Sequence, residues 1–192
     1  GSIVTCALAL AIATPFSLAT AIFMTEISPE LGKRFVQPAV EIFVGIPSVV
    51  YGWLGLTILV PLIKDIFHLR FGFSVLAAGI VLAVMIFPTI TSLAADALRS
   101  IPQGYRAASY GLGATRWQTI AKVIVPAAVT GLMTAVILGL ARAFGEALAV
   151  AMVIGKMRAF PTSILSPTNN LTAAIAADMG GAMEGSEYNI AL

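Results

Sequence analysis

The sequence contains very little charge and few reactive side chains. Asp, Glu, Lys and Arg make up 10% of the 192 residues, against about 25% in a typical soluble domain. The lone cysteine, Cys6, excludes a disulfide within the chain, and His68 is the single histidine. Hydrophobic residues make up 59%, and the mean hydropathy is +0.97. These values indicate an integral membrane protein, in which Cys6 is expected to be a small packing residue of the first span.

The sequence also lacks the common catalytic and nucleotide-binding motifs. It contains no G-x-x-x-x-G-K-[ST], H-E-x-x-H or G-x-S-x-G pattern and no cysteine-rich cluster. We therefore expect no enzyme activity, no cofactor and no metal in this chain, and any use of ATP must occur on another subunit. The net charge of +2 is too small, and too concentrated in loops, to indicate nucleic-acid binding.

Long apolar runs predict the membrane spans. About 20 apolar residues cross the hydrocarbon core as an α-helix. The runs place spans at approximately 3–25, 39–63, 73–97 and 123–141 of a single transmembrane domain over 1–192. Pro15 predicts a kink in the first span. A polar tail at 156–187 is followed by apolar residues from Tyr188 to Leu192, so we expect a further span beyond the end.

The apolar run from Val123 to Gly155 is too long for one span. Its 33 residues would form a helix of about 50 Å, against a hydrocarbon core of about 30 Å. Arg142, Gly145 and Glu146 mark the expected break, which leaves a full span at 123–141 and a short broken segment at 145–155. Small residues recur at every fourth position, which either favours close helix packing or reflects an abundance of alanine. They are Ala127, Gly131, Ala135, Gly139, Ala143, Ala147, Ala151 and Gly155.

A polar segment at 99–122 separates two of these apolar runs. It holds four of the eleven basic residues and no acidic residue, which predicts a cytoplasmic position and, by alternation, an external N-terminus. Ser100 is expected to cap a helix that begins near Pro102, and Thr115 with Gln118 forms a T-x-x-Q capping box for the next.

Two interpretations of this segment remain open from the residues alone. It can dock into the groove of a partner protein, with apolar anchors and arginines as rim charges. It can also lie on anionic lipid as an interfacial helix pair. The anchors would be Tyr105, Tyr110, Leu112 and Trp117.

The spacing within the segment resembles the EAA loop of ABC importer permeases, E-A-A, x3, G, x9, I-x-L-P. Ala107, Ala108 and Ser109 are followed by Gly113, and the run 123–126 (Val-Ile-Val-Pro) begins ten residues after that glycine. The run 45–52 (GIPSVVYG) is similar to the phosphate-specific branch of these permeases. The runs 142–146 (RAFGE) and 149–155 (AVAMVIG) are similar to its PstC-type subunit rather than the PstA-type partner.

This resemblance implies a fold, partners and site residues. The fold is all-α and integral to the membrane: a MetI-like ABC importer permease domain, partial, with cytoplasmic coupling helices and with further spans expected beyond both ends. The partners are a second permease subunit of PstA type, two ATP-binding subunits and an extracytoplasmic phosphate-binding protein in a bacterial or archaeal plasma membrane. The implied ATPase-coupling residues are Tyr105, Arg106, Ala107, Ala108, Tyr110, Gly111, Gly113, Arg116 and Trp117.

One residue departs from the family pattern. The glutamate of the EAA element is Ala107 in this chain. A contact between that carboxylate and the ATPase is therefore absent here, and docking would depend on shape and on the remaining arginines.

Arg142 and Glu146 are the candidate pathway residues. They lie one helical turn apart at apparent membrane depth, where ionisable groups usually serve a function. The planar guanidinium suits the oxygens of phosphate, and Glu146 would pair with Arg142 when the path is empty. A salt bridge that only fixes the helix break is the structural alternative. A permease for another oxyanion such as molybdate or sulfate, a passive pore and a structural scaffold are the alternative functions.

Overall fold

The structure is a computed structural model, and it describes residues 1–155, 157 and 163–175. Most of the predicted polar tail and the apolar stretch from Tyr188 to Leu192 lie outside these residues. Within them the chain is helical, and a single pair in β-bridge geometry, Gly155 with Thr168, is the only extended pairing. The all-α prediction is confirmed.

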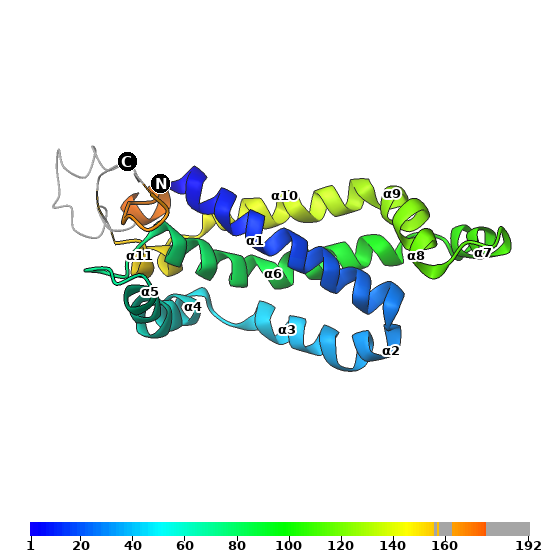
Figure 1. The fold of residues 1–192 in the computed structure, drawn as a ribbon, viewed down its shortest axis with the longest axis horizontal. Coiled ribbons are helices and arrows are strands. Elements are labelled where there is room, and N and C mark those ends of the chain that lie inside the picture. Colours follow the sequence, from blue (N-terminus) through cyan, green and yellow to red (C-terminus); the bar gives the residue numbers. More distant parts are fainter. Residues whose placement is uncertain (156, 158–162, 176–192) are drawn as a thin grey trace. The chain divides into compact units, whose positions relative to one another are not determined.

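The named elements up to residue 153 are eleven α-helices and four π-helical turns, and residues 171–175 are also helical (Figure 1). The first part of the chain contains α1 (Ser2–Ile22), η1 (Phe23–Ile27), α2 (Pro29–Leu31), η2 (Gly32–Val36), α3 (Gln37–Gly45), α4 (Ser48–Leu54), η3 (Gly55–Leu59) and α5 (Val60–Ile66). The second part contains α6 (Val75–Arg99), α7 (Gln103–Gly111), α8 (Arg116–Thr119), η4 (Ile120–Ile124), α9 (Val125–Ala127), α10 (Val129–Gly145) and α11 (Leu148–Val153).

These elements divide into two compact units. The first unit comprises residues 1–12, 46–85 and 140–192, and the second comprises 13–45 and 86–139. The helices α1, α6 and α10 contribute residues to both units.

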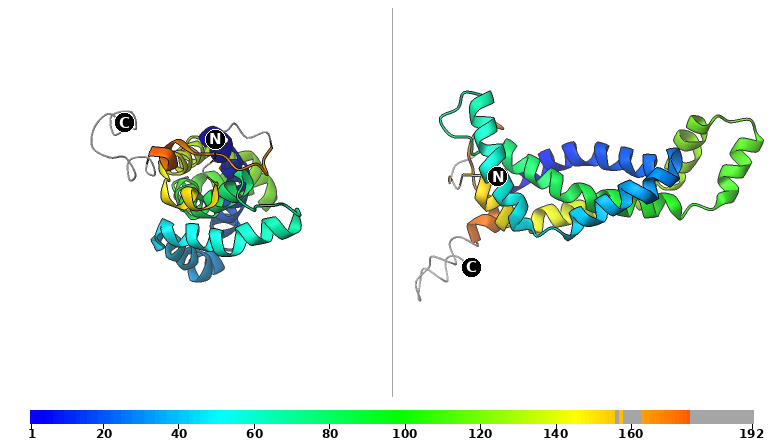
Figure 2. Two further views of the ribbon diagram at one scale, coloured as in Figure 1. Left: turned by 90° about the vertical axis from the view of Figure 1, so that its left-hand side faces the viewer. Right: turned by 90° about the horizontal axis from the view of Figure 1, so that it is seen from below.

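In the first unit, α4 packs closely against α11. A Cβ atom added to Gly52 would lie 2.8 Å from both the Cα atom of Ala149 and the sulfur of Met152, so only glycine permits this approach. Val150 and Val153 of α11 are fully buried. The helices α4 and α5 join through η3 into one continuous helical run, Ser48–Ile66, which is long and apolar enough to cross a membrane (Figure 2).

In the second unit, small residues of α10 lie against α6. A Cβ atom added to Gly131 would lie 2.6 Å from Cβ of Ala97, and one added to Gly139 would lie 2.5 Å from Cγ1 of Ile90. The four-residue spacing of small residues thus marks a close helix contact here. Ala127, at the start of the series, is exposed instead.

A buried hydroxyl group also joins α1 to α6 in the second unit. Ser17 is fully buried and donates a hydrogen bond of 3.1 Å to the backbone oxygen of Phe87. Pro88 and Thr91 lie in the same part of α6, and the Thr91 hydroxyl donates to the same oxygen at 2.7 Å. The helix continues through Pro88, as α1 continues through Pro15.

Helix breaks fall inside two of the predicted spans, whose boundaries in a membrane stay predictions. The run 39–63 is interrupted between Gly45 and Ser48, because Pro47 adopts an extended conformation (ψ 139°) and disfavours a helical residue before it. The run 123–141 is not straight, since the helical segments Arg116–Ala127 and Val129–Gly145 meet at 68°. Pro126 has no backbone N–H, which weakens the helix just before this bend.

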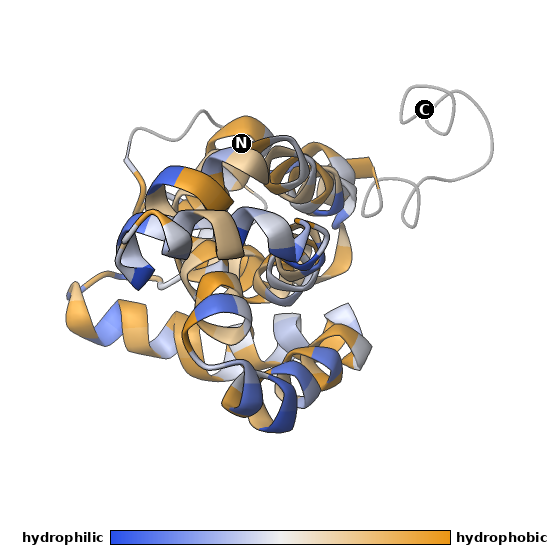
Figure 3. Cartoon of the chain, turned by 90° about the vertical axis from the view of Figure 1, so that its right-hand side faces the viewer, coloured by the Kyte–Doolittle hydropathy of each residue, from blue (hydrophilic) through white to orange (hydrophobic). Residues whose placement is uncertain are grey.

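Three helical runs of the described residues are long and apolar enough to span a membrane, and the bent pair would make a fourth. They are Ser2–Ile27, Ser48–Ile66 and Val75–Arg99. Apolar residues cover most of the helical ribbon, with hydrophilic residues in short stretches (Figure 3). Large apolar side chains such as Phe16, Ile42 and Ile58 are exposed, which suits a surface in contact with lipid or other membrane helices. Cys6 is buried, as predicted.

Candidate functional site

The polar segment 99–122 folds into two short helices, α7 and α8, joined by a tight turn. The hydroxyl of Thr115 accepts a hydrogen bond from the backbone N–H of Gln118 at 3.3 Å, and the Gln118 side chain accepts one from the backbone N–H of Thr115 at 2.9 Å. The predicted capping box is therefore confirmed. The predicted cap at Ser100 is wrong, because α6 extends to Arg99 and the Ser100 hydroxyl donates back to the oxygen of Ala97.

The turn between α7 and α8 depends on one glycine. Gly113 has φ +82°, a left-handed conformation that glycine adopts without steric cost. Its backbone N–H donates to the oxygen of Tyr110 at 2.9 Å. Beneath the turn, the hydroxyl groups of Ser109 and Thr119 are buried and lie 2.9 Å apart in a hydrogen bond. Local hydrogen bonds thus hold the two helices together.

The predicted apolar anchors are all exposed on this helix pair. Leu112 is 90% exposed and Trp117 is 67% exposed, and Tyr105 and Tyr110 are about half exposed. The motif positions Ala107, Ala108 and Gly111 are exposed as well. A short element that presents several large apolar groups in this way is typical of a docking surface or of a membrane-surface segment.

The side chains of the two arginines on the helix pair form hydrogen bonds with other segments of this chain. The guanidinium of Arg106 binds both carboxylate oxygens of Glu26, at 2.5 and 3.3 Å. It also donates to the backbone oxygens of Leu98 (3.1 Å) and Ile101 (2.8 Å). Arg116 donates to the backbone oxygen of Glu26 at 2.7 Å. Both arginines therefore contribute to internal contacts, and a role as rim charges for a partner stays a prediction.

Glu26 lies in η1 and was not among the predicted site residues. It is 8% exposed. The hydrogen bonds and charge of Glu26 raise the pKa of Arg106 above its ordinary value, and partial burial opposes that rise. The one signal in the sequence was indirect: a basic segment without acidic residues needs a counter-charge from elsewhere. Nothing in the spacing shows that this charge lies 80 residues upstream.

Arg142 and Glu146 lie on either side of the break between α10 and α11. Arg142 belongs to the last turn of α10 and is partly buried, and its charge acts electrostatically on Tyr51 of α4. The Glu146 carboxylate accepts a hydrogen bond of 3.1 Å from the backbone N–H of Ala149. The hydroxyl of Thr172 donates to the backbone oxygen of Glu146 at 2.8 Å. The break is thus placed where the sequence predicted it, whereas pairing of Arg142 with Glu146 stays a prediction.

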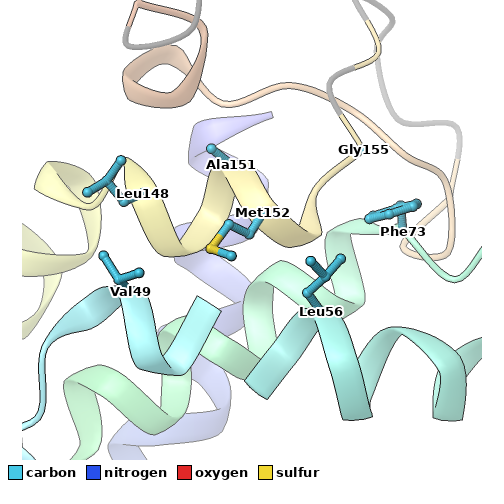
Figure 4. Close-up of a pocket in the computed structure, with 7 residues that line it drawn as sticks. All are labelled: Val49, Leu56, Phe73, Leu148, Ala151, Met152 and Gly155. Atoms are coloured by element: carbon cyan, nitrogen blue, oxygen red, sulfur yellow. The ribbon is translucent and has the colours of Figure 1, made fainter. Parts of the chain in front are cut away.

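A cavity of about 440 Å³ lies beside α11 in the first unit (Figure 4). Its lining includes Val49 from α4, Leu56 from η3, Phe73, and Leu148 and Met152 from α11. No charged residue belongs to its lining among the described residues. An anion would be poorly stabilised in such surroundings, so this cavity is not the anion route by itself.

Residues 8–179 match the family model described as "Binding-protein-dependent transport system inner membrane component". The chain belongs to this family. It is therefore a membrane component of the binding-protein-dependent transport systems, as the resemblance implied. The match covers both the segment 99–122 and the break at 146–147.

Similar proteins carry related names. The chain is 56% identical to a probable ABC transporter permease protein YqgH of Bacillus subtilis, over 98% of this chain and 61% of that protein. It is 38% identical to the phosphate transport system permease protein PstC of Haemophilus influenzae, over 92% of this chain and 62% of that protein. The chain thus spans about three fifths of the length of these relatives.

A solved structure shows the same fold. The chain superimposes on a chain of the MetNI methionine ABC transporter, in inward-facing conformations, with a TM-score of 0.69 and 24% identity. The alignment covers 99% of this chain and 80% of that chain. The MetI-like fold expected from the resemblance is confirmed.

Proposed function

We propose that this chain is the permease part of an ATP-driven importer of inorganic phosphate. The observation that supports this most directly is the similarity, at 38% identity over 92% of the chain, to a permease named for phosphate transport. The exposed helix pair α7–α8 suits docking to an ATPase, which this chain needs because its sequence contains no P-loop.

The proposed partners follow from this role. Of the two ATP-binding subunits, one contacts α7–α8 through the exposed side chains of Tyr105, Tyr110, Leu112 and Trp117. A second permease subunit of PstA type lies beside this chain in the membrane, and an extracytoplasmic binding protein delivers phosphate. In this arrangement α7–α8 faces the cytoplasm.

Arg142 and Glu146 form part of the proposed anion pathway. A partly buried guanidinium at the end of a membrane helix offers several donors to phosphate oxygens. Glu146 fixes the start of α11 through its bond to Ala149, and its negative charge limits how tightly an anion is held next to Arg142. The route thus binds an anion without trapping it.

Reconstitution of the full-length protein with its partner subunits tests this function. Proteoliposomes with ATP inside and the binding protein outside should accumulate labelled phosphate, and a tenfold excess of sulfate or molybdate should not compete. Uptake of sulfate or molybdate in preference to phosphate would support another oxyanion permease. Flux without ATP would indicate a passive pore, and purification without an ATPase subunit would indicate a scaffold.

A further inference from the structure

Three segments of the second unit meet at one guanidinium group. Arg106 lies on α7, and its side chain is 14% exposed. It bonds to the Glu26 carboxylate in η1, at the end of α1, and to the backbone oxygens of Leu98 and Ile101 at the end of α6. With the bond from Arg116 to the oxygen of Glu26, both α7 and α8 are tied to the same residue.

The burial of the ion pair between Glu26 and Arg106 makes separation of the two side chains costly. The side chain of Glu26 is 7% exposed, and its carboxylate receives two charge-assisted hydrogen bonds in a fork geometry. Removing one partner of a buried pair leaves the other charge without compensation, which is far more costly than losing an exposed pair. A displacement of α7 therefore cannot easily leave the ends of α1 and α6 behind.

We propose that Glu26 is a positioning residue for coupling: it fixes α7–α8 to the end of α1, so that a movement of the helix pair also moves α1. This inference rests on the proposed function, because the movement is supplied by an ATPase that binds α7–α8. Glu26 is buried and touches neither the ATPase nor the anion in this scheme. Its carboxylate acts through Arg106, and its backbone oxygen accepts the bond from Arg116.

A second ion pair in the same unit provides a matched control. Asp96 and Arg99 lie 3.6 Å apart at the end of α6, and their side chains are 67% and 35% exposed. Exposed pairs of this kind contribute little to stability. Asp96→Asn removes the same charge as Glu26→Gln, without disturbing the contact between α7–α8 and α1.

The experiment measures both movement and coupling in the assembled, full-length transporter. Phe23 in η1 is exposed, so Phe23→Cys reports on the end of α1 by its rate of maleimide labelling, while Cys6 is buried. We expect the labelling rate to change when ATP and vanadate are added. With Glu26→Gln, that nucleotide-dependent change should fall to under about a third, and the phosphate transported per ATP hydrolysed should fall about tenfold. With Asp96→Asn, both values should stay within about twofold of the parent.

Two further variants separate coupling from folding. Arg106→Lys retains the charge but loses the fork geometry, so it should give intermediate values. The double variant Glu26→Arg with Arg106→Glu should recover part of the coupling that Glu26→Arg alone removes. ATPase subunits should co-purify with every variant.

The inference is overturned if Glu26→Gln leaves the nucleotide-dependent labelling unchanged. It is also overturned if ATP hydrolysis and transport fall together, with the phosphate-to-ATP ratio unchanged. The parent complex could instead show a nucleotide-dependent change in labelling that requires Glu26, but no phosphate uptake. That result would support the inference and contradict phosphate as the substrate.

Discussion

At the scale of single residues, the candidate pathway depends on the charge of Arg142. Arg142 is partly buried in the last turn of α10, close enough to Tyr51 for its charge to act on the hydroxyl. A charged group in such a position is costly unless it binds a partner. Its proposed partner during transport is the anion.

We expect Arg142→Gln to abolish phosphate uptake, because glutamine offers fewer donors and no charge to the anion. Uptake should fall at least about a hundredfold, as expected for the loss of about 3 kcal/mol from a charge-assisted interaction. Assembly with the ATPase and basal ATP hydrolysis should remain. Uptake assays in proteoliposomes check this, with Arg70→Gln as an exposed control. Normal uptake by the Arg142→Gln variant would reject the pathway role.

At the scale of elements, the contact between α10 and α6 depends on glycine more strongly at position 131 than at position 139. A Cβ atom at position 131 would lie 2.6 Å from Cβ of Ala97, which cannot move without its backbone. At position 139 the nearest atoms are Cγ1 and Cδ1 of the buried Ile90 side chain, which can adjust more readily than a Cβ atom fixed to the backbone. The two sites therefore respond differently to the same added methyl group.

We expect Gly131→Ala to destabilise the protein by about 1–3 kcal/mol and Gly139→Ala by less. Thermal unfolding in detergent, followed by the labelling of buried Cys6, measures both. Gly145→Ala is the control in the same helix, because nothing lies within 4 Å of a Cβ atom there. Equal destabilisation by all three changes would show that helix packing at position 131 is not the cause.

The exposed apolar side chains of α7–α8 are the proposed binding surface for the ATPase subunit. We expect Tyr110→Asp to weaken or abolish binding of the ATPase subunit, because it places a charge among exposed apolar anchors. Co-purification on an affinity tag measures the binding, and Gln103→Asp on the same helix is the control. Unchanged co-purification together with normal transport would count against docking and favour contact with lipid.

The sequence predicted the elements better than their connections. Apolar runs and the capping box of Thr115 and Gln118 are local patterns, so the helices and the break before α11 followed from them. The interruption at Pro47 and the bend at Ala128 were not predicted, because the composition of a long apolar run does not show where the helix axis breaks or changes direction. The contact of Arg106 with Glu26 joins residues 80 apart, and a single sequence contains no signal for such a pairing.

At the scale of the whole molecule, the proposed function fixes how the chain crosses the membrane. Leu112, at the exposed turn after α7, should face the cytoplasm, and Arg70, in the segment between α5 and α6, should face the outside. Both residues are exposed. Cys6 is the single cysteine of these 192 residues and is buried.

We expect Leu112→Cys to react with a membrane-impermeant maleimide in inside-out vesicles and not in intact cells. Arg70→Cys should show the opposite pattern and serves as the control. The expectation follows from the excess of basic over acidic residues in the segment 99–122. Labelling of Leu112→Cys from outside intact cells would contradict both the orientation and the coupling role.

The buried hydrogen bond between Ser109 and Thr119 has one more consequence. Together with the capping box it gives α7–α8 a definite shape before any other protein arrives. Ordering a flexible segment costs about 1–2 kcal/mol per residue, and a rigid surface avoids that cost on association. An incoming ATPase subunit therefore binds a surface that is already ordered. The free energy of that binding is not used to order α7–α8 and can contribute to the conformational change that follows.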